Sequence, residues 1–170
     1  MAELAGTSQS AIAAYETGQR EPTMPVLDRM VRATGHRLIL DAQPDPSLFR
    51  LTDVAVDIAA TADEQRRLRL VWEFLRGAAD DDHPLPLLVM AEPPATGDRR
   101  YDAMLAAVAE DLCLHGGLRP PDWSQSSHRF LDGFWWVSDL PSARTRALVH
   151  SPASYRRRGI MIDRADLEAA

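Results

Sequence analysis

The chain has 170 residues, of which 45% are hydrophobic and 26% are charged, and its formal net charge is −6 at neutral pH. These proportions are typical of a globular protein in water, and the length allows one ordinary domain and a small one. No run approaches the roughly 18 apolar residues that a membrane span needs, and the first residues show no signal-peptide pattern. We therefore expect a cytoplasmic protein, and the single cysteine, Cys113, excludes an internal disulfide.

Residues 7–22, TSQSAIAAYETGQREP, predict a short helix of about three turns with defined ends. Ser8 is suited to capping the start, and Gly18 is suited to the left-handed conformation that often follows a helix. Helical spacing turns Ile12 and Tyr15 inward. The outward surface then carries small or polar side chains, namely Gln9, Ser10, Ala13 and Ala14. Such a surface fits the major groove of DNA, where a glutamine can pair with adenine through two hydrogen bonds.

The residues before this helix, AELAG, supply the end of a preceding helix and a turn, which makes a helix-turn-helix. Residues 1–37 resemble the Cro/repressor-type helix-turn-helix of the XRE family. The matching elements are LAG at the turn, SQSAI in the recognition helix, ETG at its end and REP before the next helix. The resemblance implies binding to a double-stranded DNA operator, with base contacts from the helix and phosphate contacts from its exit. The implied DNA-binding residues are Ser8, Gln9, Ser10, Ala14, Gln19 and Arg20.

One departure from the family concerns the first helix, which this sequence lacks. We expect an incomplete helical unit whose core misses one wall, either because the start is assigned too late or because this is a truncated form. Charge is a second concern, since residues 1–45 hold four arginines and six acidic residues, a net charge of −2. Phosphate attraction is then weak. A basic first helix or dimerisation would compensate.

The sequence after the motif predicts a further helix over 25–33, with an apolar face that supports the recognition helix. HRLILDAQ, residues 36–43, changes to an alternating pattern that is typical of a strand. An isolated strand cannot satisfy its own backbone, so pairing with a second copy in a homodimer or with a downstream segment is needed. Residues 43–48, QPDPSL, predict a linker because two prolines suppress helix there. The first domain is therefore 1–42 and the second 49–170.

The second domain begins with a helical stretch to about residue 60, followed by a helix over 62–78 with a capping box of Thr61 and Glu64. DDDH at 80–83 is typical of a solvated turn, since adjacent acidic side chains diverge. LPLLVMAEPP, residues 85–94, predicts a buried strand or another segment that crosses the core. Residues 98–115 show apolar side chains at clean helical spacing, which indicates the core helix of this domain.

The last third of the chain concentrates aromatic side chains and arginines. Asp139 or Ser138 is suited to capping a helix with Pro141 in its first turn, and GIMID, residues 159–163, predicts a short strand. Tryptophan and arginine often dominate protein interfaces, so this region is the candidate partner surface. The candidate anchors are Trp135, Trp136, Arg156, Arg157 and Arg158. The alternative interpretation, which the sequence favours equally, is that both tryptophans belong to the core and the arginines form a solvated turn. Adjacent strand residues face opposite sides, so at most one tryptophan need be buried.

Catalytic signatures are missing from the sequence. It has no glycine-rich phosphate loop, no Gly-x-Ser-x-Gly elbow and no His-Glu-x-x-His helix. Cys113, His115 and His128 are too few for a zinc site. We expect no enzyme, no metal and no cofactor.

Together these observations predict a mainly α fold with minor β structure: an incomplete helix-turn-helix followed by a small α+β domain. The expected function is sequence-specific transcription regulation, as an autoregulating antitoxin of a toxin–antitoxin pair. The C-terminal part resembles actinobacterial regulators of this kind, which implies a cognate toxin as partner, with a nucleotidyltransferase-like protein as the candidate toxin. The alternative is a toxin-neutralising, partner-binding protein whose helix-turn-helix no longer binds DNA.

Overall fold

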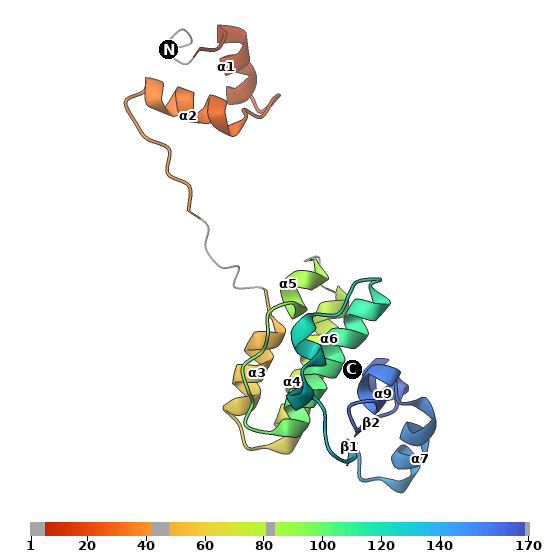
Figure 1. Cartoon of the computed structure of the whole chain (residues 1–170). Helices are drawn as coiled ribbons and strands as arrows, with labels where there is room; N and C mark the ends of the chain where they lie inside the picture. Colours follow the sequence, from red (N-terminus) through yellow and green to blue (C-terminus); the bar gives the residue numbers. More distant parts are fainter. Residues whose placement is uncertain (1–5, 42–47, 81–83, 169–170) are drawn as a thin grey trace. The chain divides into compact units, whose positions relative to one another are not determined.

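The structure is a computed structural model and describes residues 6–41, 48–80 and 84–168. The chain divides into two compact units, Met1–Pro44 and Asp45–Ala170, which are described separately (Figure 1). Three predicted features lie outside the described residues: the helix end at 2–5, most of the linker at 43–47, and the acidic turn at 81–83. The domain limits stay a prediction, although the division between the units falls inside the predicted linker segment.

The first unit contains two helices, α1 (Gln9–Glu16) and α2 (Met24–Ala33). The predicted cap of α1 is confirmed, because the Ser8 hydroxyl accepts a hydrogen bond from the Ala11 amide at 3.1 Å. Gly18 follows the helix with a φ of +68°, in the left-handed region that other residues avoid. With eight residues α1 is shorter than the three turns expected.

The strand predicted over 36–43 is wrong for the described residues 36–41, which form no regular secondary structure. Ile39 and Leu40 are each 73% exposed there. The physical reason is that a strand needs a neighbour for its backbone groups, and no described segment of this chain pairs with it.

The second unit is mainly helical with one small sheet, which confirms the predicted fold class (Figure 1). Its elements in chain order are α3 (Leu51–Ala59), α4 (Glu64–Asp80), α5 (Leu85–Val89), α6 (Arg99–His115), the 3₁₀ turns η1 (Asp122–Gln125) and η2 (Ser127–Arg129), β1 (Trp135–Trp136), α7 (Pro141–His150), α8 (Ala153–Arg156), β2 (Ile160–Met161) and α9 (Arg164–Glu168). The two strands pair in parallel, with Trp135 opposite Ile160 and Trp136 opposite Met161.

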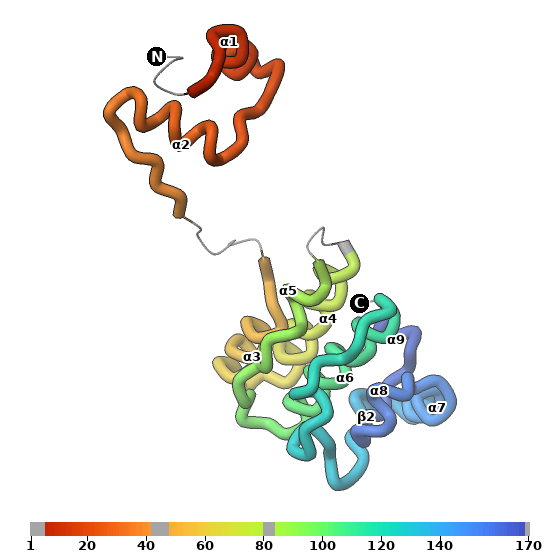
Figure 2. The backbone as a smooth tube through the Cα atoms, turned by 45° about the horizontal axis from the view of Figure 1, so that its top comes forward, coloured from red at the N-terminus to blue at the C-terminus, as the bar shows by residue number. Residues whose placement is uncertain are grey.

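The core of the second unit is built on α6, as the sequence predicts for residues 98–115. Ten of its residues are buried, and the Asp98 carboxylate caps it by accepting from the Arg100 amide. The helices α3 and α5 pack against α6, and α8 and β2 pack on it from the later half of the unit (Figure 2). Cys113 is buried in this core.

Three local predictions for the second unit need correction. The cap of α4 is Asp63, whose carboxylate accepts from the Gln65 amide at 3.0 Å, rather than a box of Thr61 and Glu64. Residues 85–89 form the helix α5 instead of a strand, because Pro86 in the first turn favours a helix start. The residue before α7 is Leu140, which has no capping side chain.

Candidate nucleic-acid interface

The N-terminal end of α1 presents three consecutive exposed side chains, Ser8, Gln9 and Ser10. The Ser8 and Ser10 hydroxyls are hydrogen-bonded to each other at 3.0 Å, and Ser8 also holds the Ala11 amide. No hydrogen bond to a described residue restrains the Gln9 side chain, so its amide is available to a base edge. This is the donor and acceptor pair that adenine recognition requires.

Further along the helix, Ala14 is half-buried, so its methyl group offers less surface than the residues at the helix start. The exit of α1 is held to the helix, because the Arg20 amide donates to the Ala14 carbonyl at 3.2 Å. Gln19 and Arg20 are exposed on this exit. The Arg20 guanidinium has no ion pair among the described residues, which leaves its charge available to a phosphate.

The electrostatics of this unit are modest. Arg32 on α2 pairs with Asp28 one turn earlier at 2.8 Å, so one of the four arginines is already matched within its own helix. Residues 1–44, which form this unit, hold five acidic residues and four arginines, so the unit has no excess of positive charge of the kind that many DNA-binding proteins present. Affinity then depends on direct contacts from α1 more than on phosphate attraction.

The packing of the unit is also sparse. Neither α1 nor α2 has a buried residue, and the apolar side chains that face inward, including Ile12, Tyr15 and Leu27, are only partly covered. A serine cap fixes the start of α1, whereas Thr23 at the start of α2 makes no capping hydrogen bond through its side chain. The unit is therefore shaped mainly by local structure.

Residues 1–37 match the helix-turn-helix family model. The match confirms the helix-turn-helix predicted for this stretch, and it ends before the second unit begins. Neither curated proteins nor solved structures give a significant match to the chain. No helix in the described ranges is long and apolar enough to cross a membrane, and no group of three potential metal ligands is found there.

Outside the helix-turn-helix, the structure separates the two tryptophans predicted as partner anchors. The ring of Trp135 packs on the buried Tyr101 ring, with centroids 5.3 Å apart. The Arg100 guanidinium lies 5.2 Å from the centroid of the Trp135 ring. Trp136 has the Arg144 guanidinium over its ring at 5.6 Å. Both tryptophans are partly buried. Trp135 packs against the hydrophobic core, whereas Trp136 contacts Arg144 of α7.

The three consecutive arginines also differ from one another. Arg158 is fully buried, pairs with Glu110 and donates to the Ser154 and Ser124 carbonyls at 2.7 Å. Arg157 donates to the same Glu110 carboxylate at 2.5 Å, whereas Arg156 is exposed. Arg158 thus has no surface to offer a partner, whereas Arg156 and Arg157 are both exposed.

The buried Glu110–Arg158 pair is a feature that the sequence analysis missed. Burial lowers the pKa of the Arg158 guanidinium, and the neighbouring Glu110 carboxylate opposes that shift. One signal could have revealed the pair. Residues 103–109 of α6, AMLAAVA, are apolar on every side of the helix, which indicates a buried segment, so a glutamate that follows it directly needs a cation.

Proposed function

We propose that the chain is a sequence-specific DNA-binding transcription regulator in which α1 enters the major groove. The observation that carries the proposal is the helix-turn-helix match over residues 1–37, on which Gln9 and Ser10 stand exposed at a capped helix start. In this arrangement Gln9 reads a base and Arg20 contacts phosphate. Two copies on adjacent half-sites would double the few arginines of the unit.

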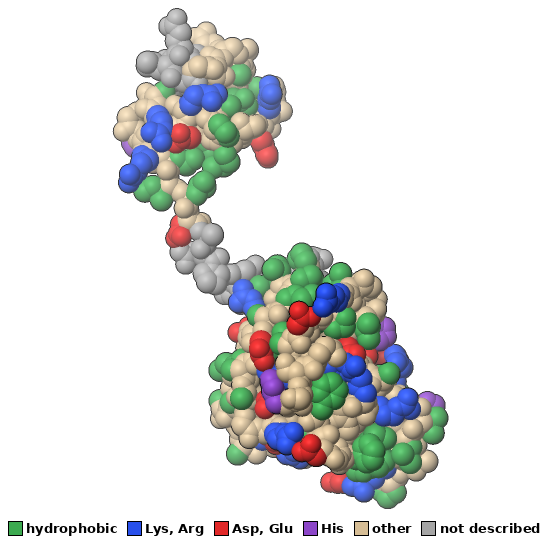
Figure 3. Space-filling view, in the orientation of Figure 1, with side chains coloured by type: hydrophobic (Ala, Val, Ile, Leu, Met, Phe, Trp, Pro, Cys, Tyr) green, Lys and Arg blue, Asp and Glu red, His purple; other side chains and the backbone are tan. Residues whose placement is uncertain are grey.

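We further propose that the regulator is an autoregulating antitoxin whose second unit binds the cognate toxin. Support comes from an apolar surface around α7, where Phe134 is 73% exposed, Leu140 66% and Val149 68%. Hydrophobic side chains gather over this part of the second unit in Figure 3. Contiguous apolar surface of this kind is typical of protein interfaces. Trp136 adjoins α7 through the Arg144 guanidinium over its ring.

A second candidate is a partner-binding protein in which the helix-turn-helix has lost DNA binding. It is favoured by the net charge of −2 over residues 1–45 and by the absence of buried residues in α1 and α2. The two candidates differ in one measurable property, namely affinity for DNA from the upstream region of the gene itself.

The DNA proposal predicts different losses for two substitutions. Gln9→Ala is expected to weaken binding to the operator by about 1–3 kcal/mol, the range for one good base contact, and to leave binding to scrambled DNA unchanged. Arg20→Ala is expected to weaken both DNAs similarly and to lower the salt dependence of binding, because a phosphate contact carries no sequence information. Fluorescence anisotropy at two salt concentrations measures both effects.

Gln65→Ala is a matched control for Gln9→Ala, since Gln65 is an exposed glutamine near the start of a helix in the other unit. Equal losses on operator and scrambled DNA for Gln9→Ala contradict the base-reading role. If the native chain binds neither DNA yet co-purifies with the product of a neighbouring gene, the second candidate replaces the first.

A further inference from the structure

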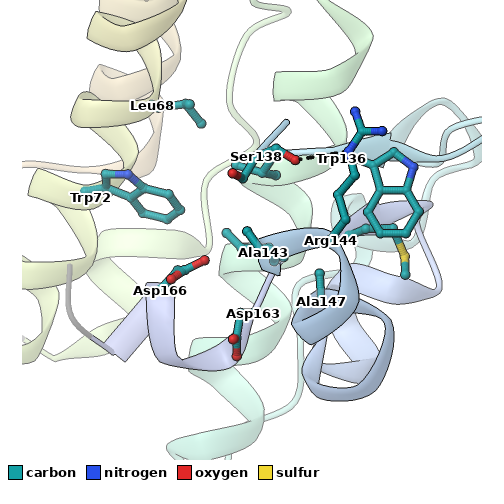
Figure 4. Close-up of a pocket in the computed structure, with 12 residues that line it drawn as sticks. Leu68, Trp72, Trp136, Ser138, Ala143, Arg144, Ala147, Asp163 and Asp166 are labelled. Atoms are coloured by element: carbon teal, nitrogen blue, oxygen red, sulfur yellow. Dashed lines mark hydrogen bonds between the residues drawn. The ribbon is translucent and has the colours of Figure 1, made fainter. Parts of the chain in front are cut away.

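The second unit contains a cavity of about 230 Å³, for which the proposed function assigns no ligand. It lies between α4 on one side and α7, β2 and α9 on the other (Figure 4). Much of its wall is apolar, formed by side chains such as Leu68, Val137, Ala143 and Ile162. A concave apolar site with a few polar groups is the usual form of a small-molecule site.

Trp72 on α4 gives this cavity an aromatic wall. The other three tryptophans, Trp123, Trp135 and Trp136, each have an arginine guanidinium over the ring, at 5.1, 5.2 and 5.6 Å. Trp72 has no such cation among the described residues, although it lines the cavity. In Figure 4 its indole extends from α4 towards α7. An aromatic face attracts a cation, so this ring offers an unused site for one.

Asp166 on α9 places a carboxylate beside the same space. In Figure 4 its carboxyl group lies between Trp72 and Ala143, whereas the carboxyl group of Asp163 points away. The nearest cation to Asp166 in the described part of the chain is Arg146, at 3.9 Å. That guanidinium is already bound to Asp163, with a nitrogen–oxygen distance of 2.7 Å. The charge of Asp166 is therefore only weakly matched within the protein.

The cavity is also lined by a positively charged side chain, Arg144, whose charge is balanced by a neighbouring carboxylate. Arg144 binds the Asp139 carboxylate at 2.7 Å and lies over the ring of Trp136. Its charge is thus balanced on the side away from Trp72. The end of the cavity that contains Trp72 and Asp166 then favours a positive group over a neutral or negative one.

From this geometry we infer that the cavity binds a small organic cation, a primary ammonium group on a short apolar or aromatic body. The ammonium group lies against the face of Trp72 and pairs with Asp166. The body fills the apolar part of the wall, where burial of its surface adds affinity. The inference concerns the second unit alone and does not depend on DNA binding.

The test is isothermal titration calorimetry of the full chain with benzylamine and phenethylamine, compared with benzyl alcohol and phenylacetate. The amines are expected to bind saturably with a Kd of about 1 mM, as suits ligands of this size, and the alcohol and the acid about tenfold more weakly. Asp166→Asn is expected to weaken amine binding about tenfold because it removes the partner charge. Trp72→Leu should do the same, while Trp72→Phe should retain part of the affinity.

Asp132→Asn serves as the control, because Asp132 is an exposed carboxylate paired with Arg99 outside this cavity. It should leave amine binding unchanged. The melting temperature of each variant shows whether it folds. If Trp72→Leu fails to fold, Asp166→Asn still decides, since its side chain is 44% exposed. The inference is overturned if no amine binds saturably, if benzyl alcohol binds as well as benzylamine, or if Asp166→Asn and Asp132→Asn have the same affinity.

Discussion

The two units of the chain obtain their shape in different ways. In the first, neither helix has a buried residue, and a serine cap and a left-handed glycine define the helix that carries the candidate DNA contacts. In the second, α6 buries ten residues under helices and a strand from both halves of the unit. The comparison teaches that a sequence motif can specify a surface without specifying a core.

The energetic contrast follows from the same observations. Each fully buried Val, Leu or Ile contributes about 1.5–3 kcal/mol, whereas one helix cap contributes about 1 kcal/mol. Isolated helices below roughly 12 residues are marginal in water, and α1 and α2 have eight and ten. The first unit therefore gains much from anything that binds its folded form, such as DNA or a second copy. The second unit is stabilised by its own buried core.

The largest effect on stability is expected when the charge of Glu110 is removed from the buried ion pair with Arg158. Glu110→Gln is expected to destabilise the second unit by about 3–5 kcal/mol, because it leaves the charge of Arg158 buried without its partner. Urea unfolding followed by tryptophan fluorescence measures this loss, since all four tryptophans belong to the second unit. Glu73→Gln, on the exposed face of α4, is the control and should be neutral. A loss below about 1 kcal/mol for Glu110→Gln contradicts the assigned role.

A pair of glycines tests close packing in the second unit. Gly159 has a φ of +80°, and an added Cβ would lie 2.2 Å from the Gly133 carbonyl oxygen. Gly159→Ala is therefore expected to cost about 2–4 kcal/mol from backbone strain and overpacking together. Gly77→Ala, within α4 and with open space around it, should instead stabilise by about 0.5–1 kcal/mol. The same urea experiment compares them, and equal effects at both positions would be incompatible with the described packing.

A smaller effect is expected on removing the cap of α6. The Asp98 carboxylate accepts from the Arg100 amide at 2.9 Å and pairs with the Arg100 guanidinium at 2.7 Å. Asp98→Ala should cost about 1–2 kcal/mol at neutral pH. The hydrogen bond from Arg100 lowers the pKa of Asp98 below the ordinary value of about 3.9.

The sign of the pH dependence follows from that shift. A carboxylate with a lowered folded-state pKa stabilises the fold fully above its unfolded value and loses that contribution as pH falls through the folded value. The difference between the native chain and Asp98→Ala should therefore be constant near neutral pH and shrink in acid, below about pH 4. Thermal unfolding across this range measures it, and a difference that grows in acid would falsify the assignment.

The equivalent change in the first unit is Ser8→Ala, which removes the cap of α1. We expect a loss of about 0.5–1 kcal/mol, the lower part of the range for a cap, because this hydroxyl is exposed and uncharged. Hydrogen exchange of the Ala11 amide reports the change directly. Thr145→Ala is a control, because its hydroxyl donates to the Pro141 carbonyl in α7 and caps no helix start. Protection of the Ala11 amide that is unchanged in Ser8→Ala shows that the cap contributes nothing.

Local signals in the sequence predicted those parts of the structure that depend on neighbouring residues. The cap at Ser8 and the apolar spacing of α6 are of this kind, and the structure has them, whereas the cap at Asp98 is a feature that the structure alone reveals. The strand predicted over 36–43 is absent from the described residues 36–41, because its pairing partner is a matter of tertiary or quaternary structure. Of the two alternatives for residues 85–94, the strand is wrong, because a short apolar run fits a strand and a helix equally well and residues 85–89 form a helix.

The candidate sites show the same limit. The exposed positions of Gln9 and Arg20 follow from one helix and its exit, so a motif suffices to predict them. By contrast, the cavity combines Trp72 from α4 with Asp166 from α9. The sequence around either residue does not predict that the two lie close together. Likewise, the sequence gives no sign that Arg158 is buried while Arg156 is exposed, because the difference depends on Glu110 in a distant helix.

The central position of α6 has a consequence for how the protein is made. At a synthesis rate of about 5–20 residues per second, the apolar faces of α3 and α4 leave the ribosome seconds before α6 can cover them. The Glu110 carboxylate is synthesised before its partner Arg158, which follows 48 residues later in the chain. Before Arg158 is synthesised the core cannot close around a paired Glu110, and exposed apolar surface of this kind promotes aggregation of nascent chains.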